Sequence, residues 1–155
     1  MTITSAICNS FKQEILVGTH NFTNGTNTFK LALYSSDSAT LSKSTTAYTA
    51  PADGTADPTN TYEVTSTSSG YTTGGNSLTS TTPVLSSDTA CCKFADTSWG
   101  SSASFTARGC LIYNSSASNK AVCAINFGAD KTVTSGTFTI QFPAQTAGNA
   151  IIQIA

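Results

Sequence analysis

Three strand-like segments follow one another in the second half of the chain, and they constrain the fold more than any other part. Residues 105–113 and 121–127 are rich in apolar and β-branched side chains. The residues between them, 114–120, are polar turn formers, which predicts a hairpin loop. The third segment, 137–142, alternates apolar and polar residues, so we expect one buried face and one face in water. The chain is therefore predicted to be a β-sheet protein.

Composition supports one folded β domain over residues 1–155. Serine and threonine make up roughly a third of the chain, far more than in an average protein. With 10% charged and 39% hydrophobic residues, the chain is too apolar and too weakly charged to be disordered. We expect a mainly β fold, namely a single-domain antiparallel β-sandwich of jelly-roll or immunoglobulin-like Greek-key type with one short N-terminal α-helix.

That helix is predicted over residues 5–17. Its apolar side chains recur every four residues and form one stripe, made of Ile7, Phe11 and Ile15. Gly18 can adopt the left-handed conformation that ends a helix. The stripe either packs on the chain's own sheet or docks on a partner subunit, and both interpretations stay open.

The remaining segments have weaker patterns. Residues 28–34 form a clean alternating strand, whereas 35–87 read as a long surface loop with short edge strands. Within it, the glycines of 70–78 are typical of a loop that passes close to another backbone. Further short strands are expected at 83–85, 90–94 and 151–154, with a loop at 95–100.

Charge and hydropathy argue against two classes of partner. Seven basic and eight acidic residues give a net charge of −1, and no basic stripe is available to neutralise nucleic-acid phosphates. The longest apolar runs have the length of a strand, and no signal-peptide pattern opens the chain. We therefore expect no nucleic-acid or membrane partner, and synthesis in the cytoplasm.

The five cysteines do not form a recognisable framework. Their number is odd, two are adjacent, and no C-x-x-C pair occurs, so neither a disulfide scaffold nor a zinc site is indicated. Buried free thiols are the expectation. A hairpin disulfide between Cys110 and Cys123 is the alternative, since the strand register is unknown at this stage.

No group of reactive side chains stands out. His20 is the single histidine and falls in a turn-rich segment, where we expect it to be solvated. Asp53 and Asp57 lack the spacing of a calcium loop and read as part of a polar loop. We expect no enzyme, and no catalytic, cofactor-binding or metal-binding residues.

Two single-copy residues have structural interpretations. Arg108, the sole arginine, is expected to reach a strand edge or pair with a carboxylate such as Asp96 or Asp130. Trp99, the sole tryptophan, is expected to anchor the core or its rim. The candidate subunit-interface residues are Ile7, Phe11, Ile15, Trp99 and Arg108.

Five segments of the chain match a known family: SAICNSFKQE at 5–14, FKLALY at 29–34, FTARG at 105–109, IYNS at 112–115 and NFGADK at 126–131. In these segments the chain resembles small structural virion proteins of tailed bacteriophages. The family carries no catalytic motif and is encoded among head and neck genes. The resemblance implies a non-enzymatic particle protein and does not fix its place in the particle.

Two functions follow as hypotheses. The first is a capsid decoration or cement protein located in the virion, which binds the major capsid protein on the outer face of the head lattice and copies of itself, as a trimer. The alternative is a tail or receptor-binding module that recognises host glycans, with Trp99, Tyr71 and Tyr48 as stacking platforms. A lytic or depolymerising enzyme is a third possibility, for which the sequence offers no site.

Overall fold

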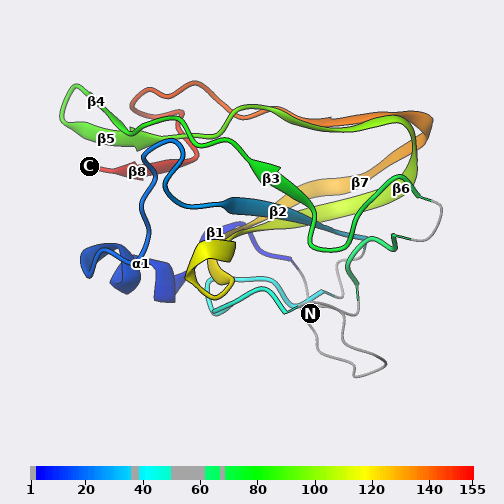
Figure 1. Cartoon of the computed structure of the whole chain (residues 1–155), viewed down its shortest axis with the longest axis horizontal. Coiled ribbons are helices and arrows are strands. Elements are labelled where there is room, and N and C mark those ends of the chain that lie inside the picture. Colours follow the sequence, from blue (N-terminus) through cyan, green and yellow to red (C-terminus); the bar gives the residue numbers. More distant parts are fainter. Residues whose placement is uncertain (1–2, 36–38, 50–61, 67–68) are drawn as a thin grey trace.

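The chain folds into an antiparallel β-sandwich with one short helix (Figure 1). This computed structural model describes residues 3–35, 39–49, 62–66 and 69–155. The larger sheet has the order β1 (Ala6–Ile7), β7 (Lys120–Ile140), β6 (Thr97–Asn114), β2 (Phe29–Tyr34) and β3 (Asn76–Leu78). The smaller sheet has the order β4 (Val84–Ser86), β5 (Thr89–Cys92) and β8 (Ile152–Ile154). The predicted fold class is confirmed, and the choice between jelly-roll and immunoglobulin-like topology stays a prediction.

One long hairpin dominates the fold. β6 and β7 pair from Thr97 with Ile140 down to Asn114 with Lys120, around a loop that contains the 3₁₀ turn Ser115–Ala117. The hairpin loop at 114–120 was predicted correctly. The predicted loop at 95–100 was wrong from residue 97 onward, because these polar residues pair with β7 as ordinary strand residues. Likewise, the segments 121–127 and 137–142 fall almost wholly within one continuous strand.

The hairpin bends over at an irregularity in its register. Ala107 pairs with Lys131, but Gly109 pairs with Asn126, so residues 127–130 of β7 lie opposite Arg108 alone. Such bulges bend a strand and increase its twist. Gly128 has a φ of +77°, which suits glycine in the bulge. As a result the two halves of the hairpin lie in the two opposite layers of the molecule (Figure 1).

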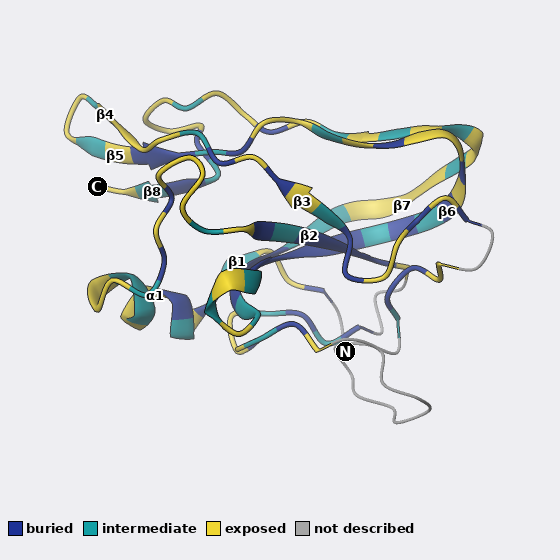
Figure 2. Cartoon of the chain, in the orientation of Figure 1, coloured by how far each residue is buried: buried dark blue, intermediate teal, exposed yellow. Residues whose placement is uncertain are grey.

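Aromatic rings fill the space between the layers. Phe22 and Phe29 stack with their centroids 4.4 Å apart, and Phe94 contacts both Phe29 and Phe142 at 5.5 Å. Trp99, which lies in a separate ring cluster with Tyr71, Phe105 and Phe138, is buried as predicted. Figure 2 shows that burial concentrates in β2 and the adjoining half of the β6–β7 hairpin, whereas the other half of β7 is largely exposed.

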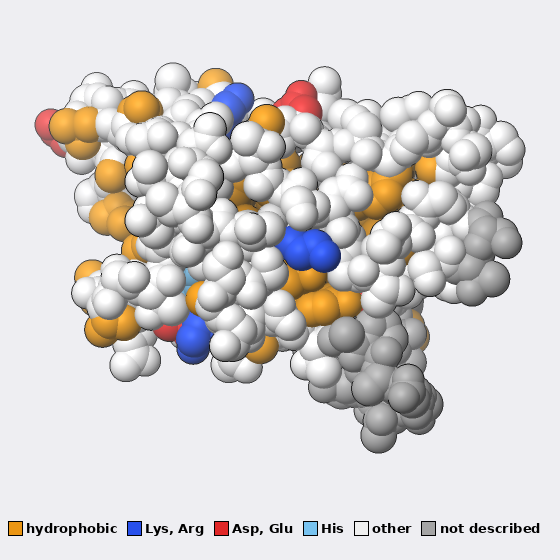
Figure 3. Space-filling view, in the orientation of Figure 1, with side chains coloured by type: hydrophobic (Ala, Val, Ile, Leu, Met, Phe, Trp, Pro, Cys, Tyr) orange, Lys and Arg blue, Asp and Glu red, His pale blue; other side chains and the backbone are white. Residues whose placement is uncertain are grey.

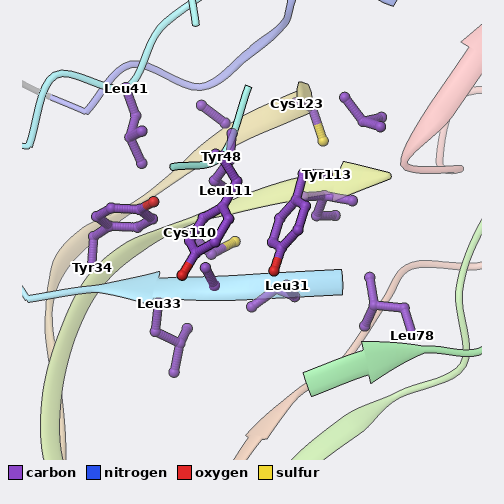
Figure 4. Packing of buried hydrophobic residues seen from close by; sticks show 14 of the residues in the cluster. Leu31, Leu33, Tyr34, Leu41, Tyr48, Leu78, Cys110, Leu111, Tyr113 and Cys123 are labelled. Carbon is purple, nitrogen blue, oxygen red and sulfur yellow. The ribbon is translucent and has the colours of Figure 1, made fainter. Parts of the chain in front are cut away.

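A second cluster covers the other face of the larger sheet. Tyr48 and Tyr113 stack with centroids 4.4 Å apart, beside Tyr34 and Leu41 (Figure 4). The segment that carries Tyr48 is fixed by backbone hydrogen bonds from Tyr48 N to Asn119 O and from Ala121 N to Thr46 O. An irregular segment thus gains the rigidity of the hairpin on which it lies.

The helix is shorter than predicted. α1 spans Asn9–Leu16, and Ile7 belongs to β1, where it pairs with Cys123 at the edge of β7. The four-residue spacing misplaced Ile7 because the sheet edge offers its backbone hydrogen-bond partners. Phe11 is buried, and Gly18 ends the helix with a φ of +74°, as expected. No helix in the described ranges is long and apolar enough to cross a membrane.

The weakly patterned region 35–87 is largely irregular where it is described, as expected. The glycine prediction for 70–78 is confirmed, because a Cβ on Gly75 would lie 1.7 Å from the carbonyl oxygen of Leu31. Asp53 and Asp57 lie outside the described residues. The short strands expected at 83–85, 90–94 and 151–154 appear as β4, β5 and β8 with slightly shifted ends.

All five cysteines are free thiols and buried, as expected. The register explains why Cys110 and Cys123 form no disulfide: Cys110 pairs with Ile125, and Cys123 pairs with Ile112, two residues away. Burial raises the pKa of Cys8 to about 11 and that of Cys92 to about 12. These thiols are therefore protonated at neutral pH and unreactive as nucleophiles.

Candidate functional site

His20 is buried, which corrects the prediction of a solvated loop residue. Its side chain lies between the rings of Phe11 and Phe29, at 4.9 and 6.4 Å between centroids. Nε2 lies 2.8 Å from Glu14 Oε2, and Nδ1 accepts a hydrogen bond of 3.1 Å from Asn114 Nδ2. The prediction failed because the turn after the helix folds back and places the ring between α1 and β2.

Glu14 connects this histidine to the hairpin. Its Oε1 accepts a hydrogen bond of 2.7 Å from Lys120 Nζ. Burial alone would raise the pKa of Glu14, but the hydrogen bonds from Lys120 and His20 outweigh that effect and hold its pKa below the usual value of 4.5. Both ring nitrogens of His20 are engaged by protein groups, so the network ties α1 to the hairpin and has no free base to offer a substrate.

A second carboxylate, that of the buried Glu63, holds the irregular segments together. Its Oε1 accepts hydrogen bonds from Tyr71 OH at 2.7 Å and Gly74 N at 2.6 Å, and its Oε2 accepts one from Tyr48 OH at 2.9 Å. Tyr71 OH in turn accepts from Leu33 N at 3.0 Å. Burial, followed by the charge of Glu63, raises the pKa of Tyr71 above its usual range. Each of these carboxylate and hydroxyl oxygens has a protein hydrogen-bond partner, so the network stabilises the fold.

The residues proposed as glycan platforms are placed in the core. Trp99 and Tyr71 are each 3% exposed and Tyr48 is 5% exposed. A sugar ring can stack only on an open aromatic face, and these three rings stack on other rings of the protein. The predicted stacking role is therefore wrong for all three side chains.

The predicted interface residues differ in how far they are buried. Phe11 and Trp99 are buried, and have almost no surface with which to contact a partner. Ile7 and Ile15 are half-buried against the core. Arg108 contacts Asp130, with Nη1 and Oδ1 3.5 Å apart. Asp130 is one of the two carboxylates predicted to pair with it. A subunit contact at Ile7, Ile15 or Arg108 stays a prediction.

Side chains of the types that bind metals are dispersed. In the part of the chain that the structure describes, no three His, Cys, Asp or Glu side chains gather in a way that could hold a metal ion.

A surface feature that the sequence did not predict lies at one end of the molecule. The large hydrophobic side chains that are exposed in the described ranges are Leu16, Val17, Val84, Leu85 and Ile154. They come from the end of α1 and from the smaller sheet, which lie at the same end in Figure 1, and Figure 3 shows hydrophobic side chains over both. We call these five residues the apolar end.

The strand register of the smaller sheet explains why Leu85 and Ile154 are exposed. Leu85 pairs with Ala90, which pairs with Ile154, so the three form one row across the sheet. The Cys92–Ile152 pair lies two residues further along the same face and is buried in the core. The inner face of the sheet thus continues beyond the core into solvent, where Leu85 is 75% exposed and Ile154 58% exposed.

Comparisons with family profiles, curated proteins and solved structures found no match for this chain. The resemblance to small virion proteins therefore stays a prediction, and the chain's own geometry is the basis for any functional conclusion.

Proposed function

We propose that the chain is a structural subunit of a tailed-bacteriophage virion, a decoration or cement protein that docks on the outer face of the head lattice through the apolar end. The observation that carries the proposal is this concentration of exposed hydrophobic side chains on α1, β4 and β8 at one end of the molecule. Contiguous apolar patches on a soluble protein commonly mark interaction surfaces.

The rest of the body suits a passive subunit. The hydrogen-bond networks of Glu14 and Glu63 hold α1 and the irregular segments on the hairpin, so the apolar end is presented on a rigid body. The charged residues are few and nearly balanced at a net charge of −1, which limits repulsion between densely packed copies.

Energetics favours binding as part of a multivalent assembly. Val84 pairs with Cys91 and therefore faces away from Leu85 and Ile154, which leaves Leu16, Val17, Leu85 and Ile154 for one contact. Burying these four side chains contributes at most on the order of 8 kcal/mol, at roughly 2 kcal/mol each. Association costs roughly 4–15 kcal/mol in lost freedom, so one such contact alone is marginal. Copies joined into a homo-oligomer, for which we propose a trimer, would bind the major capsid protein at several points and gain avidity. Binding only to the assembled shell would then stabilise the shell by mass action.

The test is to locate the chain in purified particles and count its copies by quantitative mass spectrometry and electron microscopy. We expect it on the head, in numbers that match the lattice symmetry. Leu85→Asp and Ile154→Asp should strongly reduce incorporation, because each buries a charge in the contact. Thr134→Asp, at an exposed position on β7, is the matched control and should incorporate normally. Finding the chain only in the tail, or absent from particles, would contradict the proposal.

A further inference from the structure

A pocket of about 490 Å³ lies between the two layers, away from the apolar end's five residues. Both halves of β7 line it, with Ile125 and Phe127 from one layer and Phe138 and Ile140 from the other. Cys110 and Ile151 are also among its lining residues. The volume falls within the range of roughly 300–1,000 Å³ that is typical of small-molecule sites.

The bend of the hairpin produces this pocket. From Ile125 to Ile140, β7 pairs with β6 and with no other strand in the described ranges. Alternation along both halves of β7 turns apolar side chains toward the space between the layers. Since no neighbouring strand covers that edge, Ile125, Phe127, Phe138 and Ile140 remain half-buried instead of closing into the core.

One charged residue lines the pocket, the exposed Lys131. Lys131 pairs with Ala107, which is fully buried, so the register places the lysine side chain on the inner face of the sandwich. No acidic residue is among the lining residues described, and the neighbouring Asp130 contacts Arg108. The pocket therefore combines an apolar interior with one positive group.

We propose that this pocket binds a small anionic amphiphile, whose apolar body lies between Phe127 and Phe138 and whose acid group pairs with Lys131. A carboxylate on an aliphatic chain matches both halves of the site, because the chain leaves water and the acid keeps a charged partner. The site is independent of the proposed docking surface, and the binding role goes beyond that of a passive subunit.

The test is a titration of the folded chain with decanoate, decanol and decyltrimethylammonium, followed by calorimetry and by the fluorescence of Trp99. Trp99 is the sole tryptophan and contacts Phe138 at 5.9 Å between centroids, so it reports on occupancy. We expect saturable 1:1 binding, with decanoate about fivefold tighter than decanol because of the exposed ion pair. The cationic detergent should bind more weakly than both.

Two variants test the charge of Lys131 and the apolar part of the pocket separately. Lys131→Gln should remove the preference for decanoate over decanol, whereas Lys43→Gln, at an exposed lysine outside the pocket, should keep it. Ile125→Trp should fill the pocket and abolish binding of both ligands, with circular dichroism confirming that the variant folds. Equal binding of decanoate and decanol by the wild type, or no saturable binding, would overturn the proposal.

A last experiment tests whether the ligand is a free amphiphile or a lipid surface. Sedimentation with phosphatidylglycerol vesicles should leave the chain in the supernatant if the ligand is a free molecule. Vesicle binding that depends on Lys131, without binding of free decanoate, would overturn the proposed pocket and assign the charge to a membrane contact.

Discussion

At the scale of single residues, Glu14 joins three parts of the chain through one carboxylate. It accepts hydrogen bonds from Lys120 at the start of β7 and from His20, while His20 is held on its other side by Asn114 at the end of β6. Lys120 and Asn114, which flank the loop of the long hairpin, thus both belong to this network. The helix is consequently fixed by polar contacts as well as by the packing of Phe11.

The pH dependence of stability follows from Glu14. Because its pKa is lowered in the folded chain, its contribution is fully present above the unfolded value of 4.5 and is lost as the pH falls through the folded value. Glu14→Gln should therefore cost about 1–3 kcal/mol at pH 7, and the difference from the wild type should shrink below pH 4.5. Urea unfolding at pH 7, 5 and 3 measures it. Asp88→Asn, which removes an exposed carboxylate, controls for net charge, and a Glu14→Gln difference that is equal at pH 7 and pH 3 would contradict the assignment.

At the scale of elements, α1 depends on one buried ring. Phe11 is 3% exposed and packs against His20 and Phe22. Phe11→Ala should lower the free energy of unfolding by about 3–5 kcal/mol, measured by denaturant titration. Lys12→Ala, on the exposed side of the same helix, should change it by less than about 0.5 kcal/mol. A loss below 1 kcal/mol at Phe11 would contradict the view that its ring holds α1 on the sheet.

The loop before β3 depends on a close backbone approach. Gly75 has a φ of +72°, and its missing Cβ leaves room for Leu31 O. Gly25 has a similar φ of +81° but is exposed, with open space where a Cβ would lie. Gly25→Ala should cost about 1 kcal/mol from backbone strain, whereas Gly75→Ala should cost at least about twice as much because β2 and the loop must separate. Equal costs in thermal unfolding would show that the contact carries no energy.

Local patterns predicted the elements whose own residues show strand alternation or turn formers, even where the pairing strand is distant in the sequence. The strand at 28–34, the hairpin loop and the short final strand were confirmed because alternation and turn residues determine them locally. The sequence failed where distant segments decide the outcome. Ile7 joined the sheet because β7 offered an edge, and His20 became buried because β2 and α1 enclose it.

The candidate sites were the least predictable part. Leu85 and Ile154 are 69 positions apart along the chain and meet only through β5, so no local pattern joins them. The pocket likewise needs the bend of the hairpin, which a register shift opposite Arg108 creates. Gly128 was a local signal for that bend, although a glycine in a strand-like segment can equally mark a turn or a close backbone contact.

At the scale of the whole molecule, the long hairpin makes the two layers one structural unit. β6 and β7 run through both layers and pair along almost their full length. For one layer to unfold alone, the separation of β6 and β7 would have to stop at the register irregularity opposite Arg108, with the same two strands still paired in the other layer. The smaller sheet adds to this coupling, because Cys92 and Ile152 pack into the common core.

We therefore expect a single cooperative unfolding transition. Trp99 reports on one half of the hairpin through its contact with Phe138, and the stacked Tyr48–Tyr113 pair reports on the other half. Tryptophan fluorescence, near-ultraviolet tyrosine dichroism and far-ultraviolet dichroism should give superimposable urea curves with one midpoint. If the tryptophan signal changed at a lower urea concentration than the tyrosine signal, the bend opposite Arg108 would be a hinge between two independently stable halves, and the hairpin would not couple them.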